Sequence, residues 1–375
     1  NSGDVSKLEA TQDLVEHLPH PSIWLEGVVP TAHPEWFTEW NIKGILPGEA
    51  FQGLQDLCEG KEPKKAPFLR SENDLLGGAW EFFDLTKYRT HNWTTVDGTI
   101  PSPYAVVATS VGCPYPCSFC NVNSLYGGPN FRRRTVESVI KEFDYLVNRG
   151  VNVFRIVDNI FTLQPEWVHH FCDMMAARGY GELNIKVYGR IEPLAKDLSM
   201  LPAMKKAGIR WISYGIESAD YQVRLTAKKG TLSQDIETVV KATRDAGLYQ
   251  FGNFMFGLPK DTTQTMEKNL ELAFHYLPDW VNFNVAIPYP GTPWFTQAVQ
   301  EGWVPPKAWS SYSQLNVHVR PRGTDTLSPA EVVQFRDKAF QIFFRSAAHQ
   351  AHIAKTFGPT GTNVVNDMLA VPFRR

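Results

Sequence analysis

From residue 104 onward the chain repeats one unit, and this repeat constrains the fold more than any other feature. Each unit is an apolar run rich in Val, Ile, Phe and Tyr, then a loop, a helix-patterned stretch and a glycine. The apolar runs predict strands at 104–109, 151–157, 184–189, 210–216, 249–256 and 280–287. The glycines that end the helical stretches are Gly150, Gly179, Gly208 and Gly247.

Six successive units of this kind, with no signal for an antiparallel hairpin, predict parallel strands joined by right-handed crossovers. The sheet is then a complete barrel, a partial barrel or a doubly wound sheet. Apolar residues at 136–147 fall on one helical face, and Thr135 is the expected N-cap of that helix.

Polar residues follow the predicted strands, where the carboxyl ends of parallel strands meet. Asp158 and Asn159 follow the second strand, Arg190 the third and Glu217 the fourth. Asn253 interrupts the fifth strand. Because three cysteines follow the first strand, we expect all these groups to share one mouth of the sheet.

The flanking segments have a different pattern. Before residue 100 the chain is richer in Pro, Trp and loops, with one β/α-like piece at 22–59 in which Gly48 and Glu49 open a helix. Residues 61–103 are expected to form a linker around the main domain. After 295, residues 328–354 predict one amphipathic helix on the outside of the barrel, opened by a capping box from Ser328 to Glu331.

Bulk composition argues against several classes of protein. The 375 residues carry a net charge of -2 without blocks of one sign, so a nucleic-acid partner is not expected. No apolar run is long enough to span a membrane, and the first four residues lack the pattern of a signal peptide. We therefore expect a cytoplasmic protein, and the missing initiator Met suggests a processed chain or a fragment.

Three of the five cysteines lie in one short loop, Cys113-x3-Cys117-x2-Cys120. An odd cysteine count with this clustering favours metal or redox chemistry over disulfides. No Cys or His between 121 and 168 supplies a fourth local ligand. Three thiolates on a [4Fe-4S] cluster leave one iron open to chelate S-adenosylmethionine (SAM). Two alternatives are an electron-transfer cluster and a zinc site completed by His91, His169 or His170.

The cysteine spacing, with the aromatic Phe119 before the last cysteine, resembles the radical SAM superfamily over about residues 100–295. This resemblance implies a partial (β/α)6 barrel at 104–295. Further phrases resemble the cobalamin-binding class, which includes anaerobic magnesium-protoporphyrin ester cyclases and radical methyltransferases. These phrases occupy residues 108–114, 215–218, 254–259 and 288–293.

The resemblance also assigns cofactor-binding roles to residues outside the cysteines. Glu217 is expected to contact the ribose or amino end of SAM, with a buried salt bridge as the alternative role. Asn253 and the backbone of Met255 are expected near the ribose and adenine. Arg190 and Lys229 are the expected partners of its carboxylate. Phe119 and Asp158 complete the predicted cofactor-binding set, Asp158 standing where the superfamily usually has glycines.

Residues 1–60 resemble only the last part of a cobalamin-binding Rossmann-like domain. The Asp-x-His-x2-Gly motif that supplies a lower axial ligand does not occur in the sequence. Either the sequence is truncated or this remnant binds no cobalamin. The C-terminal extension at 296–375 is expected to be mainly helical.

The resulting functional hypothesis is a radical SAM enzyme that attacks an unactivated C–H position by forming a 5′-deoxyadenosyl radical. It would act on a small-molecule or natural-product-like substrate, as a methyltransferase, cyclase or oxidoreductase, with flavodoxin or ferredoxin as electron donor. Two alternatives remain: a methylthiotransferase-like modifier of RNA or protein, and a non-enzymatic Fe–S electron carrier. The short basic run from Arg132 to Arg134 is interpreted as a solvated face, with contact to an anionic substrate or a cofactor phosphate as the alternative.

Overall fold

The computed structural model describes residues 7–18, 23–63, 77–314, 316 and 318–371. Within them, the main sheet has six strands, all parallel, in the order β10-β9-β8-β7-β6-β3. These strands are β3 (Tyr104–Val107), β6 (Val153–Ile156), β7 (Asn184–Gly189), β8 (Ile209–Glu217), β9 (Tyr249–Phe256) and β10 (Trp280–Val285). The six predicted strands are therefore confirmed, with ends that shift by a few residues.

The strand order selects between the architectures that the sequence leaves open. The strands follow chain order across the sheet, and β3 and β10 form its two edges. A doubly wound sheet reverses its order at a switch point, and a closed barrel pairs its first and last strands. The described part of the chain does neither, so the core is a partial (β/α)6 barrel, as predicted.

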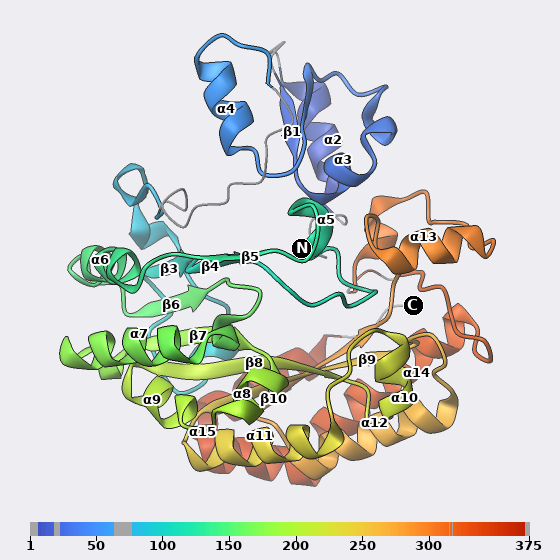
Figure 1. The fold of residues 1–375 in the computed structure, drawn as a ribbon. Coiled ribbons are helices and arrows are strands. Elements are labelled where there is room, and N and C mark those ends of the chain that lie inside the picture. The colour runs from blue at the N-terminus through green and yellow to red at the C-terminus, as the bar shows by residue number, and fades with distance from the viewer. Residues whose placement is uncertain (1–6, 19–22, 64–76, 315, 317, 372–375) are drawn as a thin grey trace.

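Helices cover the outer side of this curved sheet (Figure 1). The helices between the strands are α6 (Val136–Val147), α7 (Pro165–Ala177), α8 (Ile191–Lys196), α9 (Met200–Lys206), α10 (Tyr221–Thr226), α11 (Ser233–Asp245) and α12 (Thr263–Tyr276). Short 3-10 turns lie at η6 (Phe161–Leu163) and η7 (Tyr180–Glu182). Thr135 caps α6 by accepting a hydrogen bond from the Ser138 amide, and the four predicted glycines all have positive φ.

The two faces of the sheet differ in exposure. Val107 and Ile156 are 1% and 0% exposed and lie under the helices. Val106 and Val157, their neighbours along the chain, are 39% and 40% exposed. Because successive strand residues point to opposite faces, the inner face of the partial barrel is accessible to solvent at this point.

An antiparallel pair that the sequence analysis did not predict flanks the cysteine loop. β4 (Ser110–Gly112) pairs with β5 (Phe131–Arg133), and α5 (Val122–Leu125) lies between them in the chain. The prediction of a sheet region without antiparallel pairing is therefore wrong at this one place. The pair brings the two ends of the cysteine loop together.

The N-terminal segment forms a small parallel two-stranded sheet, β1 (Trp24–Glu26) with β2 (Gly44–Leu46). It includes α2 (Leu8–His17), α3 (Val28–Ala32), η1 (Pro34–Phe37) and α4 (Phe51–Cys58), so the helix expected at Gly48 begins later. Figure 1 shows this segment (blue) beyond α5. Glu49 forms an ion pair with Arg132, which joins the segment to β5.

Residues 77–103 run along the barrel as 3-10 turns, whereas 64–76 of the expected linker and the first four residues of the chain lie outside the described residues. The turns are η3 (Trp80–Phe82), η4 (Leu85–Lys87) and η5 (Asn92–Thr95). Trp93 of η5 packs its ring against Trp211, Phe251 and Trp280, so this turn closes one end of the sheet interior.

The C-terminal part consists mainly of helices: α13 (Pro293–Gln300), the turn η8 (Trp309–Tyr312), α14 (Pro329–Arg345) and α15 (Ala347–Ala370). The Ser328–Glu331 capping box is confirmed. The single helix predicted at 328–354 is wrong, because Ser346 is extended and caps a new helix by accepting from the His349 amide. A kink at Gly358 then interrupts α15.

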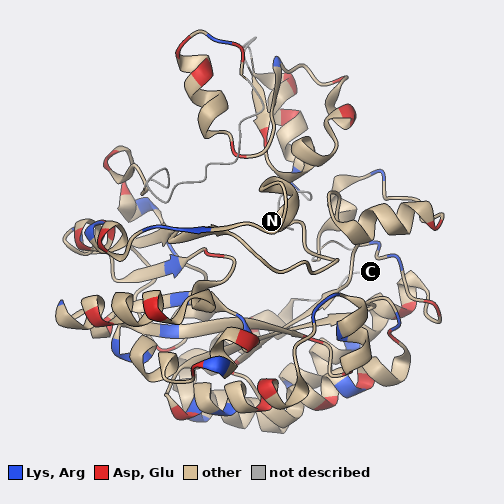
Figure 2. Ribbon diagram, in the orientation of Figure 1, with Lys and Arg blue, Asp and Glu red and all other residues tan. Residues whose placement is uncertain are grey.

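Charged residues of both signs are interspersed over the outer helices (Figure 2). Among the described helices, none combines the length and apolarity that crossing a membrane requires.

Candidate active site

The cysteine loop lines a cavity of about 190 Å³ at the carboxyl ends of the strands. Cys113, Cys117 and Cys120 all contribute to its wall. The loop is held from two sides, since the Ser118 amide donates to the Ala227 carbonyl (3.0 Å) and the Ser118 carbonyl accepts from the Trp294 amide (3.0 Å). These backbone bonds tie the cysteine loop to the end of α10 and the start of α13.

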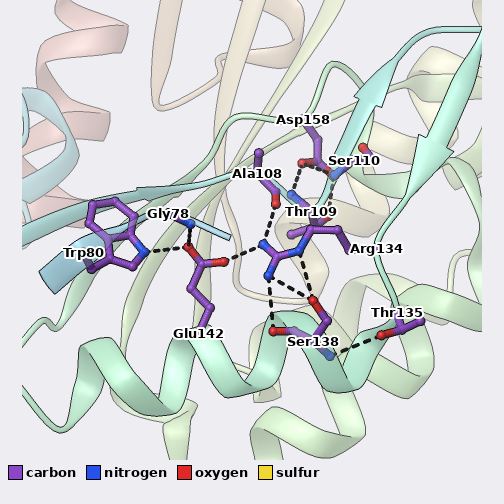
Figure 3. A network of polar contacts seen from close by, with 10 residues as sticks. All are labelled: Gly78, Trp80, Ala108, Thr109, Ser110, Arg134, Thr135, Ser138, Glu142 and Asp158. Atoms are coloured by element: carbon purple, nitrogen blue, oxygen red, sulfur yellow. Dashed lines mark hydrogen bonds and ion pairs between the residues drawn. The ribbon is translucent and has the colours of Figure 1, made fainter. Parts of the chain in front are cut away.

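A buried polar network anchors the strand that leads into the loop (Figure 3). One oxygen of Asp158 accepts from the amides of Thr109 (2.7 Å) and Ser110 (2.9 Å), and the other accepts from the Thr109 hydroxyl. Asp158 is 1% exposed. Its carboxylate thus binds the backbone between β3 and β4. Asp158 is not among the described residues that line the cavity.

The basic run is buried, so its interpretation as a solvated face is wrong. Arg133 pairs with Asp158 and donates to the Phe161 carbonyl (2.6 Å). Arg134 pairs with Glu142, whose other oxygen accepts from the Trp80 indole (Figure 3). These two pairs fix β5 and the residue after it to α6 and to the segment that follows β6.

Arg190 lies directly beside the cluster loop. Its guanidinium donates to the sulfur of Cys117 (3.4 Å) and stacks on the ring of Tyr115 at 3.7 Å from the centroid. It also forms a bidentate pair with Glu192 (2.7 and 2.9 Å). Burial alone would raise the pKa of Glu192, but hydrogen bonds and charge from Arg190 lower it overall.

A second buried ion pair joins Lys229 and Glu217, with 2.7 Å between Nζ and Oε1. Glu217 ends β8 with φ of 64°, and the pairing of β8 with β9 shifts register between Gly215 and Glu217. A Cβ atom at Gly215 would approach Glu217 Oε1 to 2.0 Å. Because Gly215 has no side chain, the carboxylate of Glu217 and the ammonium of Lys229 can lie over the end of β8.

Most of the predicted site residues line the same cavity: the three cysteines, Phe119, Arg190, Glu217, Lys229 and Asn253. Asn253 donates to the Ser213 hydroxyl (3.0 Å) and the Tyr214 carbonyl (3.1 Å). Met255 is not among the lining residues. Its side chain packs with Phe119 in a small apolar cluster behind the loop, and its carbonyl accepts from Asn269.

The sequence analysis missed the carboxylate of Glu192, although an acid two residues after a predicted cation is a usable signal. It also missed Tyr188 and Ser213, which line the cavity from β7 and β8. Among the described lining residues there is no histidine. His169 instead pairs with Asp197 on the outside, and His91 caps η5.

The donor set fits an iron–sulfur cluster. All the candidate ligands are thiols. Burial raises the pKa of the Cys120 thiol to about 11 and also raises the pKa of the Cys113 thiol. In the described residues, no three His, Cys, Asp or Glu side chains converge on one ion position. A cubane does not require such convergence, because its three thiolates bind different irons.

Residues 107–273 match the family model of the radical SAM superfamily. This match contains the cysteine loop and the strands β6 to β9, so this part of the chain carries a radical SAM domain. A [4Fe-4S] cluster and SAM are the cofactors that such a domain implies.

Two curated relatives agree with this assignment. An uncharacterized methyltransferase of Pyrococcus horikoshii is 28% identical over 74% of this chain and 57% of its own length. The anaerobic magnesium-protoporphyrin IX monomethyl ester cyclase of Cereibacter sphaeroides is 30% identical over 50% of this chain and 30% of its own length. The chain thus spans less than two thirds of either relative.

Among solved structures, the cobalamin-dependent SAM radical enzyme OxsB, with aqua-cobalamin and SAM bound, superposes with a TM-score of 0.61 at 16% identity. The superposition covers 96% of this chain and 60% of OxsB. At this level of identity the likeness concerns the fold, and it includes the N-terminal segment as well as the barrel.

Proposed function

We propose that this chain is a radical SAM enzyme in which Cys113, Cys117 and Cys120 hold a [4Fe-4S] cluster and the adjoining cavity binds SAM. The observation that carries the proposal is that these three thiols share one small cavity with Arg190, Lys229 and Glu217, which belong to two ion pairs at the strand ends. The reduced cluster supplies the electron that breaks a carbon–sulfur bond of SAM, which starts radical chemistry at an unactivated C–H position. The proposed barrel domain is 104–295, between residues 1–60 with the linker 61–103 and the extension 296–375.

The two ion pairs suit a zwitterionic ligand. Arg190 and Lys229 carry two positive charges, and Glu192 and Glu217 carry two negative charges. The ammonium and carboxylate groups of SAM can exchange partners with these pairs without leaving a buried charge unpaired, which would be costly. We assign Lys229 and Arg190 to the carboxylate and Glu217 to the amino end or ribose.

Other residues position this set. Asn253 orients the strand ends through Ser213 and the Tyr214 carbonyl. Asp158 is proposed to act on the loop rather than on SAM, because its oxygens are engaged with the backbone of Thr109 and Ser110. Phe119 and Met255 both pack against the small apolar cluster that includes Ala227 and Trp294, and they would support the loop through it.

The described residues do not complete a cobalamin site. A cavity of about 530 Å³ separates Ala32 and His33 of the N-terminal segment from Cys117 and Cys120. Within the described residues, the N-terminal segment has two paired strands, β1 and β2, and the ring of His33 is stacked on Trp36. Methyl transfer belongs to the proposal only where a methyl-cobalamin partner is supplied.

The proposed substrate class is a small molecule, in line with the cyclase and methyltransferase relatives. A flavodoxin or ferredoxin of the cytoplasm is the proposed electron donor. A methylthiotransferase needs a second cluster. The other two of the five cysteines do not provide one, since Cys172 is buried in the core and Cys58 is exposed at the end of α4.

The test is an anaerobic reconstitution with iron and sulfide, followed by addition of SAM and dithionite. We expect 5′-deoxyadenosine from the reconstituted protein and none from Cys117→Ala. The variants Glu217→Gln and Lys229→Met should raise the Kd for SAM at least about tenfold, or roughly 1.4 kcal/mol each. Exposed Glu182→Gln and Lys241→Met are the matched controls.

A cluster-loaded, reduced protein that neither binds nor cleaves SAM would contradict the proposal and favour the electron carrier. Unchanged SAM affinity in both Glu217→Gln and Lys229→Met would contradict the assigned cavity while leaving the cluster in place.

A further inference from the structure

Two basic side chains lie side by side on the inner face of the sheet, below the site. Arg155 of β6 and Lys186 of β7 are directly paired in register. Lys186 is 4% exposed. Among the described residues, neither has an acidic partner. The ammonium of Lys186 instead lies over the rings of Trp93 (3.7 Å) and Phe251 (4.4 Å).

This arrangement is unfavourable for the folded chain on its own. Like charges on directly neighbouring strand positions repel each other, and a buried cation without a counter-ion loses its hydration. The buried Nε atom of Arg155 also has no hydrogen-bond partner. Burial, with a further contribution from the charge of Arg155, lowers the pKa of Lys186 well below its ordinary value. Other buried arginines of this protein have partners for their guanidinium groups, either carboxylates, as in Arg133 and Arg134, or backbone carbonyls, as in Arg224.

We propose that Arg155, Lys186 and the Tyr188 hydroxyl form a receptor for a carboxylate group of the substrate. This proposal rests on the proposed function and adds the chemical class of its substrate. Arg155 donates a hydrogen bond to the Tyr188 hydroxyl, which leaves the hydroxyl proton free to be donated to an anion. The guanidinium and ammonium supply the charge that such a group requires.

The position of the receptor fits a substrate that spans the barrel interior. Arg155 and Lys186 line a cavity of about 170 Å³, and Tyr188 lines the site cavity beside the cysteines. Tyr188 is therefore the member of the receptor that reaches the site cavity, while its hydroxyl is bonded to Arg155. Lys186 precedes Arg190 by four residues, which is about 13 Å along a strand.

The wall between these two points is partly apolar, because Val106 and Val157 are exposed on the same inner face. The expected substrate is an apolar molecule with a carboxylate on the order of 10 Å from the carbon that reacts.

The experiment measures binding of a probe acid to the reconstituted protein by calorimetry. The probe is 4-phenylbutyrate, and its neutral counterpart is 4-phenylbutanamide. We expect the protein to bind the acid at least tenfold more tightly than the amide. Lys186→Met and Arg155→Leu should each lower the affinity for the acid at least tenfold. Arg149→Gln is the control, since Arg149 stacks on Tyr145 on the outside of the barrel.

A second readout separates a receptor from a structural cation. Met keeps the length of Lys186 and its contacts with the aromatic rings, so Lys186→Met should melt at the same temperature or higher. The receptor is ruled out if the protein does not bind the acid, or if it binds acid and amide equally. It is also ruled out if both variants keep an unchanged affinity for the acid. If a variant fails to fold, the comparison of acid with amide on the unaltered protein still decides.

These failures are distinguishable from failure of the proposed function. Formation of 5′-deoxyadenosine by the same preparation would show that the radical site is intact while the carboxylate receptor is rejected.

Discussion

Replacing Gly112 by alanine should damage the cysteine loop far more than the same change at another glycine with similar backbone. Gly112 has φ of +84°, and an added Cβ would lie 2.2 Å from the Asn130 carbonyl oxygen. The conformational part costs about 1–2 kcal/mol, and the overlap adds about 1–3 kcal/mol by forcing β4 and β5 apart. We expect a total loss of about 2–5 kcal/mol.

Gly150 is the matched control, because its φ is +82° and nothing lies within 4 Å of an added Cβ. Gly150→Ala should therefore lose only about 1–2 kcal/mol. The assay is urea unfolding of the iron-free protein by circular dichroism, together with iron content after reconstitution. Gly112→Ala should also retain less iron, since the residue directly precedes Cys113. Equal stability losses in the two variants, with equal iron content, would contradict the predicted overlap between an added Cβ at Gly112 and the Asn130 carbonyl.

Three further predictions concern buried polar groups. Asp158→Ala should lose about 3–5 kcal/mol in urea unfolding, because Arg133 and two amides lose their partner; a loss no larger than that of exposed Asp173→Asn would contradict this. Thr135→Ala should cost about 1 kcal/mol through loss of the α6 cap, and an unchanged midpoint would contradict the cap. Burial raises the pKa of Asp261 from 3.8 to about 6. Between these pH values the folded chain therefore binds one proton more than the unfolded chain. The free energy of unfolding should fall by roughly 2–3 kcal/mol as the pH rises through this range. Asp261→Asn should remove most of this fall in unfolding curves measured from pH 4 to 7, and an unchanged pH slope would contradict it.

The repeat-based part of the fold was predictable because it follows from local periodicity. Apolar runs and closing glycines mark each β/α unit, and the resulting strands lie within a few residues of their expected positions. Periodicity left open whether the sheet is a complete barrel, a partial barrel or doubly wound. The strand order decides between these, and periodicity could not give it because it depends on pairing between distant segments.

The errors have specific physical causes. β4 and β5 have three residues each, too few to show an alternating pattern. The break at Ser346 was missed because the apolar pattern continues across it, although a serine three residues before His349 is a possible N-cap. The burial of the basic run depends on Glu49, Asp158 and Glu142, which lie 83, 25 and 8 residues from their arginines.

The distribution of charge inside the barrel links the site to the receptor below it. At the strand ends, Arg190 and Lys229 each have a carboxylate partner, so a zwitterionic cofactor can enter without changing the net charge. Farther down the same inner face, Arg155 and Lys186 have none among the described residues. If Arg155 and Lys186 served only to stabilise the barrel, we would expect a neighbouring carboxylate as their counter-ion, as at Arg190. The contrast between a balanced and an unbalanced pair of cations therefore supports a division of roles, with the cofactor at the mouth and an anionic substrate group at the floor.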